Sequence, residues 1–388
     1  MPEAAVVTAK GTRRWEQGHP WIYRSDVTTR PSSAAGAVRV LDRSGKPLGW
    51  ALWSPHSEIS LRLLDRGPDV TIDEEWWRST IAKALRRRES LHPVASAFRL
   101  VHGEADGCPS LICDRYDRWL VVQLLSAGAE AFRDSIVSAL IALLRPEGIL
   151  ARNDVPIRDK ERLPRLTECL HGSVPREIEV HEHGVRYLAA PWDGQKTGAF
   201  LDQRENRALV GRVAAGRALD CFSYHGSFAL HLARQASSVV ALDASAAALA
   251  RASQNMHCNG MTNIEFKVAD AFDFLRSEET SDSRYDTIVL DPPAFAKTKS
   301  ALSGALRGYK EINLRAMRLL KPGGLLFSAS CSFHLSKALF LEMLEDAARD
   351  SGRRIALRDF RGQPLDHPEV LTIPETGYLK GALIEALD

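Results

Sequence analysis

A carboxylate and a thiol stand just beyond two apolar runs in the C-terminal third of this 388-residue chain. Asp291 follows the run at 285–290, and Cys331 follows the run at 325–329, between two serines. If these runs form adjacent strands, about 5 Å separates them and both side chains face one pocket. A thiolate that adds to C6 of cytosine makes C5 nucleophilic, while a carboxylic acid can hold N3 and N4 of the ring. The pair therefore indicates covalent catalysis on a pyrimidine carbon.

The loop that begins at Asp291 reads Asp-Pro-Pro-Ala-Phe. Pro292 and Pro293 stiffen it, and Phe295 offers a ring on which a flipped planar base can stack. The loop resembles the motif of methyltransferases that modify an exocyclic amine, in which the acid or amide accepts a hydrogen bond from that amine. Alone it favours an amino methyltransferase, whereas Cys331 on the next strand favours methylation of carbon. A buried strand cysteine without a chemical role is the simpler alternative for Cys331.

The stretch at 216–243 has the pattern of a unit that holds a cofactor. A short apolar run, a turn with Gly226, a helical pattern and a second apolar run ending in Asp243 predict a βαβ unit. The terminal acid can accept both hydroxyls of a ribose. Only one glycine of the dinucleotide pattern is present, so a phosphate-binding turn is not expected. The spacing resembles motif I of class I S-adenosylmethionine-dependent methyltransferases, carried here by Asp220, Phe222, Gly226 and Phe228. A βαβ unit with a structural glycine is the alternative.

Seven apolar runs alternate with helical patterns from residue 190 onward, which predicts a doubly wound α/β sheet. The predicted strands are 217–221, 239–243, 264–268, 285–291, 325–331, 355–360 and 379–386. The last connection is expected to be short and free of helix, which makes the final hairpin antiparallel. A ligand binds such a sheet at the carboxyl ends of its strands, and these ends carry Asp220, Asp243, Asp270, Asp291 and Cys331. Asp270 is placed to accept from an adenine amino group, beside the backbone N–H of Ala271.

The first 72 residues show short apolar runs separated by turn signals, a pattern typical of a small β-barrel. This segment carries ten Lys and Arg against seven Asp and Glu, so its charge of +3 exceeds the +2 of the whole chain. Cations that meet phosphates and rings that stack on bases suit RNA; the candidates are Lys10, Arg13, Arg14, His19 and Trp21. The sequence Gly-His-Pro-Trp at 18–21 resembles the start of PUA domains, which bind structured RNA. A solvated loop with a core tryptophan is the alternative.

Residues 73–188 begin with a predicted helix that ends in three arginines, and strands and a second helix follow. Cations at a helix C-terminus favour the macrodipole, so these arginines are expected to be structural. His181 and His183 have the spacing of metal ligands but lack a third ligand at a usual distance, so no metal is expected. Nothing in this segment looks catalytic. We therefore expect three domains, at 1–72, 73–188 and 189–388.

The composition is that of a soluble globular protein, with 45% hydrophobic and 26% charged residues. A net charge of only +2 confines any nucleic-acid surface to a local patch. No apolar run approaches the length of a membrane span, and residues 1–15 lack the apolar core of a signal peptide. A cytoplasmic location without membrane contact is expected. The six cysteines contain no C-x-x-C pair and are expected to be free thiols.

Across nearly the whole chain, the order of motifs resembles the ribosomal RNA large subunit methyltransferase I family of single-cysteine RNA 5-methylcytosine methyltransferases. The motifs are GHPW, VHGEADGCPSLICDRY, VVQLLSAGAE, GQKTGAFLDQR, LDCFSYHGSFA, LDPPAF, RGYKEIN, SCS and ETGYLKG. The resemblance implies a PUA domain, a small α/β domain and a class I methyltransferase domain with a seven-stranded sheet. It also implies Cys331 as the nucleophile and Asp291 as the acid that holds the base. The implied cofactor is S-adenosylmethionine, lined by Gln203, Phe222, Asp243 and Asp270. The further candidates for cofactor binding are Arg204, Asp220, Ser223, Gly226, Ala271 and Asp291.

Large-subunit (23S) ribosomal RNA is the substrate that the resemblance implies. Another group of RNA cytosine methyltransferases has a second cysteine beside Asp-Pro-Pro, but position 294 here is Ala. The group that removes the C5 proton is therefore unassigned, and a water held by Asp291 is one hypothesis. Two rival functions stay open: methylation of a guanine or adenine nitrogen, and a non-catalytic RNA-binding factor for ribosome assembly. The modified nucleotide, the choice between free RNA and a ribosomal particle, and the oligomeric state, a homodimer included, are also open.

Overall fold

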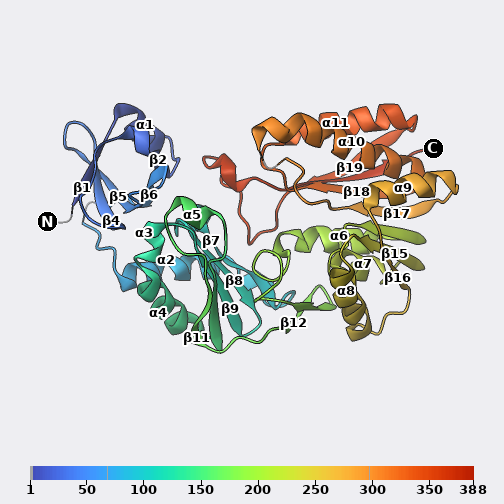
Figure 1. The fold of residues 1–388 in the computed structure, drawn as a ribbon, viewed down its shortest axis with the longest axis horizontal. Coiled ribbons are helices and arrows are strands. Elements are labelled where there is room, and N and C mark those ends of the chain that lie inside the picture. The colour runs from blue at the N-terminus through green and yellow to red at the C-terminus, as the bar shows by residue number, and fades with distance from the viewer. Residues whose placement is uncertain (1–2, 68, 297) are drawn as a thin grey trace. The chain divides into compact units, whose positions relative to one another are not determined.

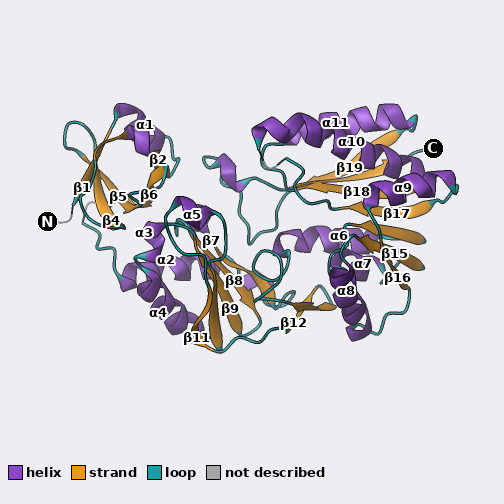
Figure 2. Cartoon of the chain, in the orientation of Figure 1, coloured by secondary structure: helices purple, strands orange, loops and turns teal. Residues whose placement is uncertain are grey.

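The computed structural model describes residues 3–67, 69–296 and 298–388, which form four sheets and the helices that connect their strands (Figure 1). Helices and strands alternate most regularly toward the C-terminus (Figure 2). The chain divides into two compact units. The first contains 1–181, 189–201 and 365–376, and the second contains 182–188, 202–364 and 377–388. The division into three domains at residues 72 and 188 stays a proposal.

A six-stranded sheet in the order β2-β6-β5-β4-β1-β3 forms the N-terminal part. Its strands are β1 (Ala4–Val7), β2 (Trp21–Tyr23), β3 (Val27–Thr29), β4 (Gly36–Leu41), β5 (Pro47–Trp53) and β6 (Ile59–Asp65). The sequence predicted strands here, but it missed the helix α1 (Ala9–Glu16). Thr8 caps α1 because its side chain accepts from Gly11 N (3.1 Å), and Trp15 anchors the helix in the core.

A five-stranded sheet in the order β11-β10-β9-β8-β7 follows. It contains β7 (Ala97–His102), β8 (Leu111–Tyr116), β9 (Trp119–Leu124), β10 (Gly148–Arg152) and β11 (Thr167–Gly172), with helices α2 (Glu74–Arg86), α3 (Ala127–Glu130), α4 (Arg133–Leu144) and α5 (Ile157–Lys160). Trp77, Ile81 and Leu140 share a core with Phe98 of β7. Arg88, just after α2, is 1% exposed and pairs with Asp106 (2.6 Å), so it is structural. The hairpin β12 (Ile178–Glu182) and β13 (Val185–Ala189) makes a two-stranded sheet.

The C-terminal part is a seven-stranded sheet in the order β16-β15-β14-β17-β18-β20-β19, which confirms the predicted methyltransferase sheet. Its strands are β14 (Arg217–Cys221), β15 (Ser238–Asp243), β16 (Ile264–Val268), β17 (Tyr285–Leu290), β18 (Leu320–Ser330), β19 (Ile355–Arg361) and β20 (Lys380–Ala386). The first five are parallel, and β20 runs antiparallel to β18 and β19. The helices are α6 (Arg204–Val213), α7 (Ser227–Leu232), α8 (Ala246–Cys258), α9 (Ala271–Thr280), α10 (Leu302–Leu319) and α11 (Lys337–Ser351).

The connection between β19 and β20 differs from the prediction of a short segment without helix. It runs from 362 to 379 and contains a 3-10 helix at Pro374–Thr376. Its middle part, 365–376, belongs to the first unit. Within that unit, the Asp366 carboxylate accepts from Arg99 N (2.8 Å), and the Asp366 carbonyl accepts from Arg88 (2.9 Å). The segment is ordered by these buried hydrogen bonds, which residue periodicity does not reveal. In the part of the chain that the structure describes, no helix is long and apolar enough to cross a membrane.

Candidate active site

The polar residues predicted to mark the strand ends do lie at one edge of the seven-stranded sheet. Asp220 pairs in register with Ala241 of β15 and with Val289 of β17, and Asp243 is the last residue of β15. Asp270, Asp291 and Cys331 follow β16, β17 and β18 by one or two residues. Because these strands are parallel neighbours, their carboxyl ends meet at the edge where such sheets bind ligands.

Asp220 is a buried carboxyl group at the centre of this edge. Its Oδ2 accepts from Ser223 Oγ (2.8 Å) and Ala229 N (2.9 Å). Its Oδ1 is buried and has no partner among the residues that the structure describes. The pKa of Asp220 is raised to about 7, mainly by burial. The hydrogen bond from Ser223 lowers this pKa, and the negative charge of Asp291 raises it. An unpaired buried oxygen is costly, so it marks a place for a donor that a ligand can supply.

The loop after β14 has a backbone conformation that L side chains rarely adopt. Phe222 (φ 64°), Tyr224 (φ 51°) and Gly226 (φ 83°) all lie in the left-handed region. Each such bulky residue costs about 1–3 kcal/mol, and such strain gathers at ligand sites. A Cβ at Gly226 would also lie 2.9 Å from the Ala252 Cβ, so a larger residue does not fit there. The sequence indicated the glycine, but it gave no sign of the strain at the two aromatic residues.

Asp243 and Asp270 hold the backbone of this edge in place. Asp243 accepts from Tyr224 N (2.9 Å) and Ser245 N (2.8 Å), one hydrogen bond on each oxygen. Asp270 caps α9, because its Oδ1 accepts from Phe272 N (2.9 Å) and Asp273 N (3.2 Å). Each carboxylate oxygen can accept more than one hydrogen bond, so these contacts leave acceptor capacity for a ligand.

Asp291 is bound by a side chain that the sequence assigned to the cofactor. Gln203 Nε2 donates to Asp291 Oδ1 (2.7 Å), and Asn206 Nδ2 donates to Gln203 Oε1 (2.6 Å). Gln203 and Asn206 are 3% and 2% exposed, so this amide chain is rigid. Arg204 is fully buried and its Nε donates to Glu205 (3.0 Å). Gln203 thus orients the carboxylate of Asp291, and its role toward the cofactor stays a prediction.

The serines on both sides of Cys331 bind one tyrosine, which the sequence did not single out. Ser330 Oγ donates to Tyr309 Oη (2.9 Å), and Tyr309 Oη also hydrogen-bonds Ser332 Oγ (2.9 Å). Ser332 Oγ in turn accepts from Ala296 N in the loop that begins at Asp291 (3.2 Å). This network joins the residues on both sides of Cys331 to the loop that begins at Asp291. Burial raises the pKa of Tyr309, which therefore stays neutral.

The ring of Phe295 lies in an aromatic cluster rather than standing alone. Its centroid is 4.6 Å from that of Tyr309, 6.0 Å from Phe272 and 6.5 Å from Phe222. Pro292 is buried and Pro293 is exposed in the same loop. Phe333, two residues after Cys331, is 51% exposed. This exposed ring is available for stacking, and motif spacing did not reveal it.

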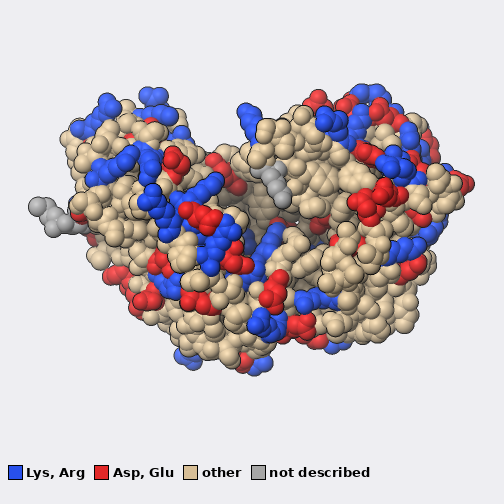
Figure 3. Space-filling model, viewed as in Figure 1, with Lys and Arg blue, Asp and Glu red and all other residues tan. Residues whose placement is uncertain are grey.

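The predicted RNA-contacting residues gather around α1. Lys10, Arg13, Arg14 and His19 line one open cavity of about 380 Å³, together with Gln17 and Thr372. Lys10 and Arg13 are exposed, and the Arg14 guanidinium lies 4.6 Å from the ring centroid of Tyr23. His19 pairs with Glu375 (3.2 Å), and Trp21 Nε1 donates to Glu104 (2.9 Å). Figure 3 shows Lys and Arg side chains over this N-terminal part of the visible face.

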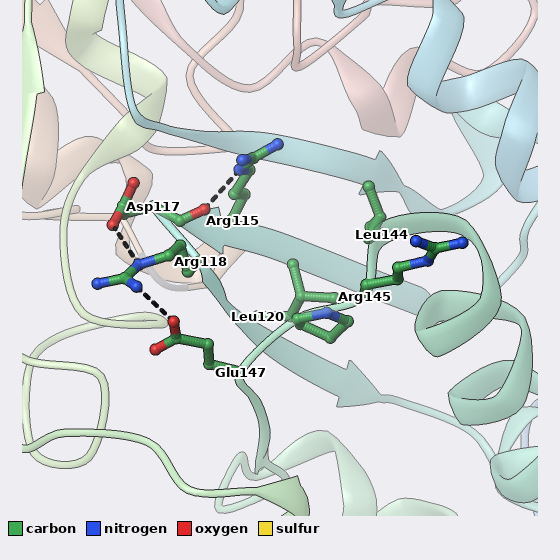
Figure 4. A pocket seen from close by; sticks show the side chains of 8 residues that line it. Arg115, Asp117, Arg118, Leu120, Leu144, Arg145 and Glu147 are labelled. Atoms are coloured by element: carbon green, nitrogen blue, oxygen red, sulfur yellow. Dashed lines mark hydrogen bonds and ion pairs between the residues drawn. The ribbon is translucent and has the colours of Figure 1, made fainter.

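A second basic pocket lies at one end of the five-stranded sheet (Figure 4). Its volume is about 150 Å³, below the roughly 300–1,000 Å³ of usual ligand pockets. Arg118 pairs there with Asp117 and Glu147, and Arg115 donates to the Asp117 carbonyl (2.6 Å). These contacts neutralise most of the charge that an anion would meet, so we assign it no function.

The His-Glu-His sequence at 181–183 contains a buried ion pair. The Glu182 carboxylate binds Arg207 and accepts from Tyr187 Oη (3.2 Å), and His231 Nε2 lies 3.1 Å from it. Among the described residues, no group of three His, Cys, Asp or Glu side chains could hold a metal ion. The sequence showed the spacing of the two histidines, but it did not indicate that Arg207 pairs with the glutamate between them.

Comparisons with known proteins agree with this geometry. A PUA-like domain model matches residues 5–66, and an S-adenosylmethionine-dependent methyltransferase model matches residues 152–378. The ribosomal RNA large subunit methyltransferase I of Shewanella amazonensis is 40% identical over 375 residues, which cover 94% of this chain and 95% of that protein. The enzyme of that name from Pseudoalteromonas atlantica is 38% identical over 378 residues, 95% of each chain.

Two solved structures share the fold over 99% of this chain and all of theirs, both at 20% identity. One is a putative methyltransferase from Streptococcus mutans, with a TM-score of 0.83. The other, with a TM-score of 0.85, is a putative methyltransferase in complex with SAH.

Proposed function

The chain belongs to the ribosomal RNA large subunit methyltransferase I family, and we propose that it transfers a methyl group from S-adenosylmethionine to C5 of a cytosine in large-subunit (23S) ribosomal RNA. One observation carries the proposal: Cys331 and Asp291 follow adjacent parallel strands at the edge that holds the methyltransferase motif. Such a reaction would take place in the cytoplasm, where ribosomal RNA meets this enzyme.

The residues of the edge fit the cofactor. Oδ1 of Asp220 is a buried acceptor that needs a donor, and Gly226 allows the left-handed turn of this loop to pack closely against Ala252. Asp243 and Asp270 retain acceptor capacity for ribose hydroxyls and an adenine amine. Phe222, Ser223 and the backbone N–H of Ala271 complete the proposed set. Bound S-adenosylmethionine supplies an electrophilic methyl group.

Cys331 is the proposed nucleophile. Its Sγ, as thiolate, forms a bond to C6 of the cytosine, and the electron pair of the C5–C6 double bond moves to C5. C5 can then accept the methyl group. Loss of the C5 proton afterwards returns an electron pair to the ring, the double bond re-forms and Sγ leaves C6 as a thiolate. A water held by Asp291 is our candidate for the group that takes this proton.

Asp291 is the proposed holder of the base. A protonated carboxyl group can donate to N3 and accept from the N4 amine, which offsets the charge that develops on the ring. Gln203 fixes the orientation of this group through its 2.7 Å hydrogen bond. A carboxyl group that could rotate freely would lose part of the advantage of prior orientation.

We further propose that the cavity at α1 contacts RNA phosphates through Lys10, Arg13 and Arg14. His19 and Trp21 take part in hydrogen bonds inside the first unit, so their contribution would be to shape this surface. Positive charge is local here, as the small net charge of the chain requires.

The test combines a variant with a chemical map of the product. Ribosomal RNA from cells without the protein, complemented with wild type or Cys331→Ala, is digested and its methylated nucleosides are identified by mass spectrometry. We expect one 5-methylcytosine to depend on the wild-type protein and to be absent with Cys331→Ala, while calorimetric binding of S-adenosylmethionine persists. A methyl group on a guanine or adenine nitrogen would support the rival activity, and failure to bind the cofactor would support a non-catalytic factor.

A further inference from the structure

Lys380 is a buried lysine beside the nucleophile that the reaction above leaves without a role. It opens β20 within the sequence Glu-Thr-Gly-Tyr-Leu-Lys-Gly and is 1% exposed. Burying an ammonium group is costly unless a charge or a set of hydrogen bonds compensates it. A residue of this kind at a strand end next to a thiol therefore calls for an explanation beyond packing.

Lys380 contacts the residues on both sides of Cys331. In the antiparallel pairing of β18 with β20, Lys380 lies opposite Ser330, the residue before Cys331. Its Nζ donates to the carbonyl oxygen of Ser332, the residue after Cys331 (2.7 Å), and to that of Tyr378 (2.8 Å). An ammonium group has three N–H donors. The two carbonyl contacts use two of them.

The charged form of Cys331 interacts with the ammonium group of Lys380. Burial lowers the pKa of Lys380 to about 8, the negative form of Cys331 raises it, and the exposed Lys337 lowers it. Lys380 on β20 and Tyr309 on α10 interact electrostatically with Cys331, and Lys337 on α11 interacts with Lys380. Tyr309 is neutral at physiological pH because its pKa is raised. Lys380 is thus the buried cation of this set.

We propose that Lys380 is a positioning residue that holds Cys331 as a thiolate, an inference that rests on the proposed function of Cys331 as nucleophile. The Cys331 thiol releases its proton to water, the S–H electron pair stays on Sγ, and Lys380 keeps its own proton throughout. The same charge favours the end of the reaction, when Sγ takes back the electron pair of its bond to C6 and leaves as a thiolate. Thiolates next to cations have lowered pKa values for the same reason.

Alkylation of Cys331 tests the proposal without using methyl transfer. Full-length protein is treated with iodoacetamide from pH 5 to 10, and the alkylated peptides are followed by mass spectrometry. We expect Cys331 to react at lower pH than the exposed Cys169 in the same sample. In Lys380→Met, the rate at pH 7 should fall about tenfold and the Cys331 profile should move to higher pH by about one unit, with Cys169 unchanged. Lys380→Arg should stay within about threefold of the wild type.

Two further results decide against alternatives. Lys337→Met removes an exposed cation that interacts with Lys380, and it should shift the Cys331 profile much less than Lys380→Met, because water screens it. Equal Cys331 profiles in wild type and Lys380→Met would overturn the proposal and leave Lys380 as a backbone clamp. If no Lys380 variant folds, a wild-type Cys331 that titrates no lower than Cys169 overturns it equally. Cytosine methylation by Cys331→Ala would instead refute the proposed function, whatever the alkylation shows.

Discussion

The second unit contains two groups of buried charges that behave in opposite ways. In the first, Glu182 is bound by Arg207, His231 and Tyr187, all within 3.2 Å. Burial opposes the charge of Glu182, yet Arg207 and His231 hold its pKa far below the usual range. In the second, at the strand ends, burial raises the pKa of Asp220 to about 7 and lowers that of Lys380 to about 8. The paired charge of Glu182 stays ionised and stabilises the fold. The pKa values of Asp220 and Lys380 lie near neutral pH, so these two groups can respond to a ligand or a reaction.

The largest effect is expected where the satisfied group is broken. Glu182→Gln leaves Arg207 as a buried cation without its counter-charge, which should lower the free energy of unfolding by about 3–5 kcal/mol. Urea denaturation followed by circular dichroism measures this loss. The matched control is Glu265→Gln, which removes an exposed partner of Lys267 and should cost less than about 1 kcal/mol. Equal losses in the two variants would mean that the buried group is no more stabilising than a surface pair.

Asp220→Asn should change how stability depends on pH. The pKa of Asp220 is about 7 in the folded protein and about 3.9 in the unfolded chain. The folded state therefore binds the proton more tightly than the unfolded chain does. The stability that this proton contributes is fully present below about pH 4 and is lost as pH rises through 7. As pH rises from 5 to 7 in the absence of cofactor, the free energy of unfolding should fall by about 1 kcal/mol less per pH unit in the variant than in the wild type.

Unfolding midpoints of wild type and Asp220→Asn at pH 5, 6, 7 and 8 give the comparison. Asp286→Asn is the control with the opposite sign. Burial opposes the charge of Asp286, but hydrogen bonds from Lys321 and Arg217 N lower its pKa, so its stability is present at neutral pH and is lost in acid. Parallel pH profiles of wild type and Asp220→Asn would refute the view that Asp220 is under-satisfied.

Tyr309→Phe should show whether the hydrogen bonds around Cys331 affect methyl transfer or only the stability of the fold. The variant loses the hydroxyl that joins Ser330 to Ser332, at about 1–2 kcal/mol of stability. Methyl transfer in a single turnover should slow about tenfold, because Cys331 is then less well oriented. Tyr285→Phe, which removes a hydroxyl bound to Glu278 at the other end of β17, should cost similar stability without slowing methyl transfer. Equal rates for both variants would contradict the positioning role.

The smallest effect is expected for exposed charges. Arg13→Ala should weaken RNA binding by about 1 kcal/mol or less and reduce the salt dependence of the affinity by about one ion. Fluorescence anisotropy with a large-subunit RNA fragment at several salt concentrations measures both. Arg349→Ala on α11, also exposed, is the control and should change neither. An unchanged salt dependence in Arg13→Ala would remove α1 from the proposed RNA surface.

Several features of the edge could be predicted because their chemistry demands particular residues at particular distances. Asp220, Gly226 and Asp243 follow a spacing that predicts a βαβ unit, and the parallel pairing of β14 with β15 confirms this unit. The role of the three residues in cofactor binding stays a prediction. Helix α1 was missed because the short apolar runs of 1–72 suggest strands. The last connection was misjudged because Asp366 owes its place to buried hydrogen bonds with Arg88 and Arg99, which leave no periodic signal.

By itself, the sequence determined the family, the cofactor motif and the two residues that could do chemistry, since each depends on residue types at short spacing. Only the tertiary structure decided which residues surround them. Gln203 donates a hydrogen bond to Asp291, Tyr309 hydrogen-bonds the serines beside Cys331, and Lys380 lies across from Ser330 on the neighbouring strand. Lys380 lies across from Ser330 because the strand order places β20 beside β18. Gln203, just before α6, and Tyr309 on α10 reach the same edge through side-chain hydrogen bonds. Whether a buried charge is satisfied depends on such three-dimensional neighbours, and so, therefore, does its pKa.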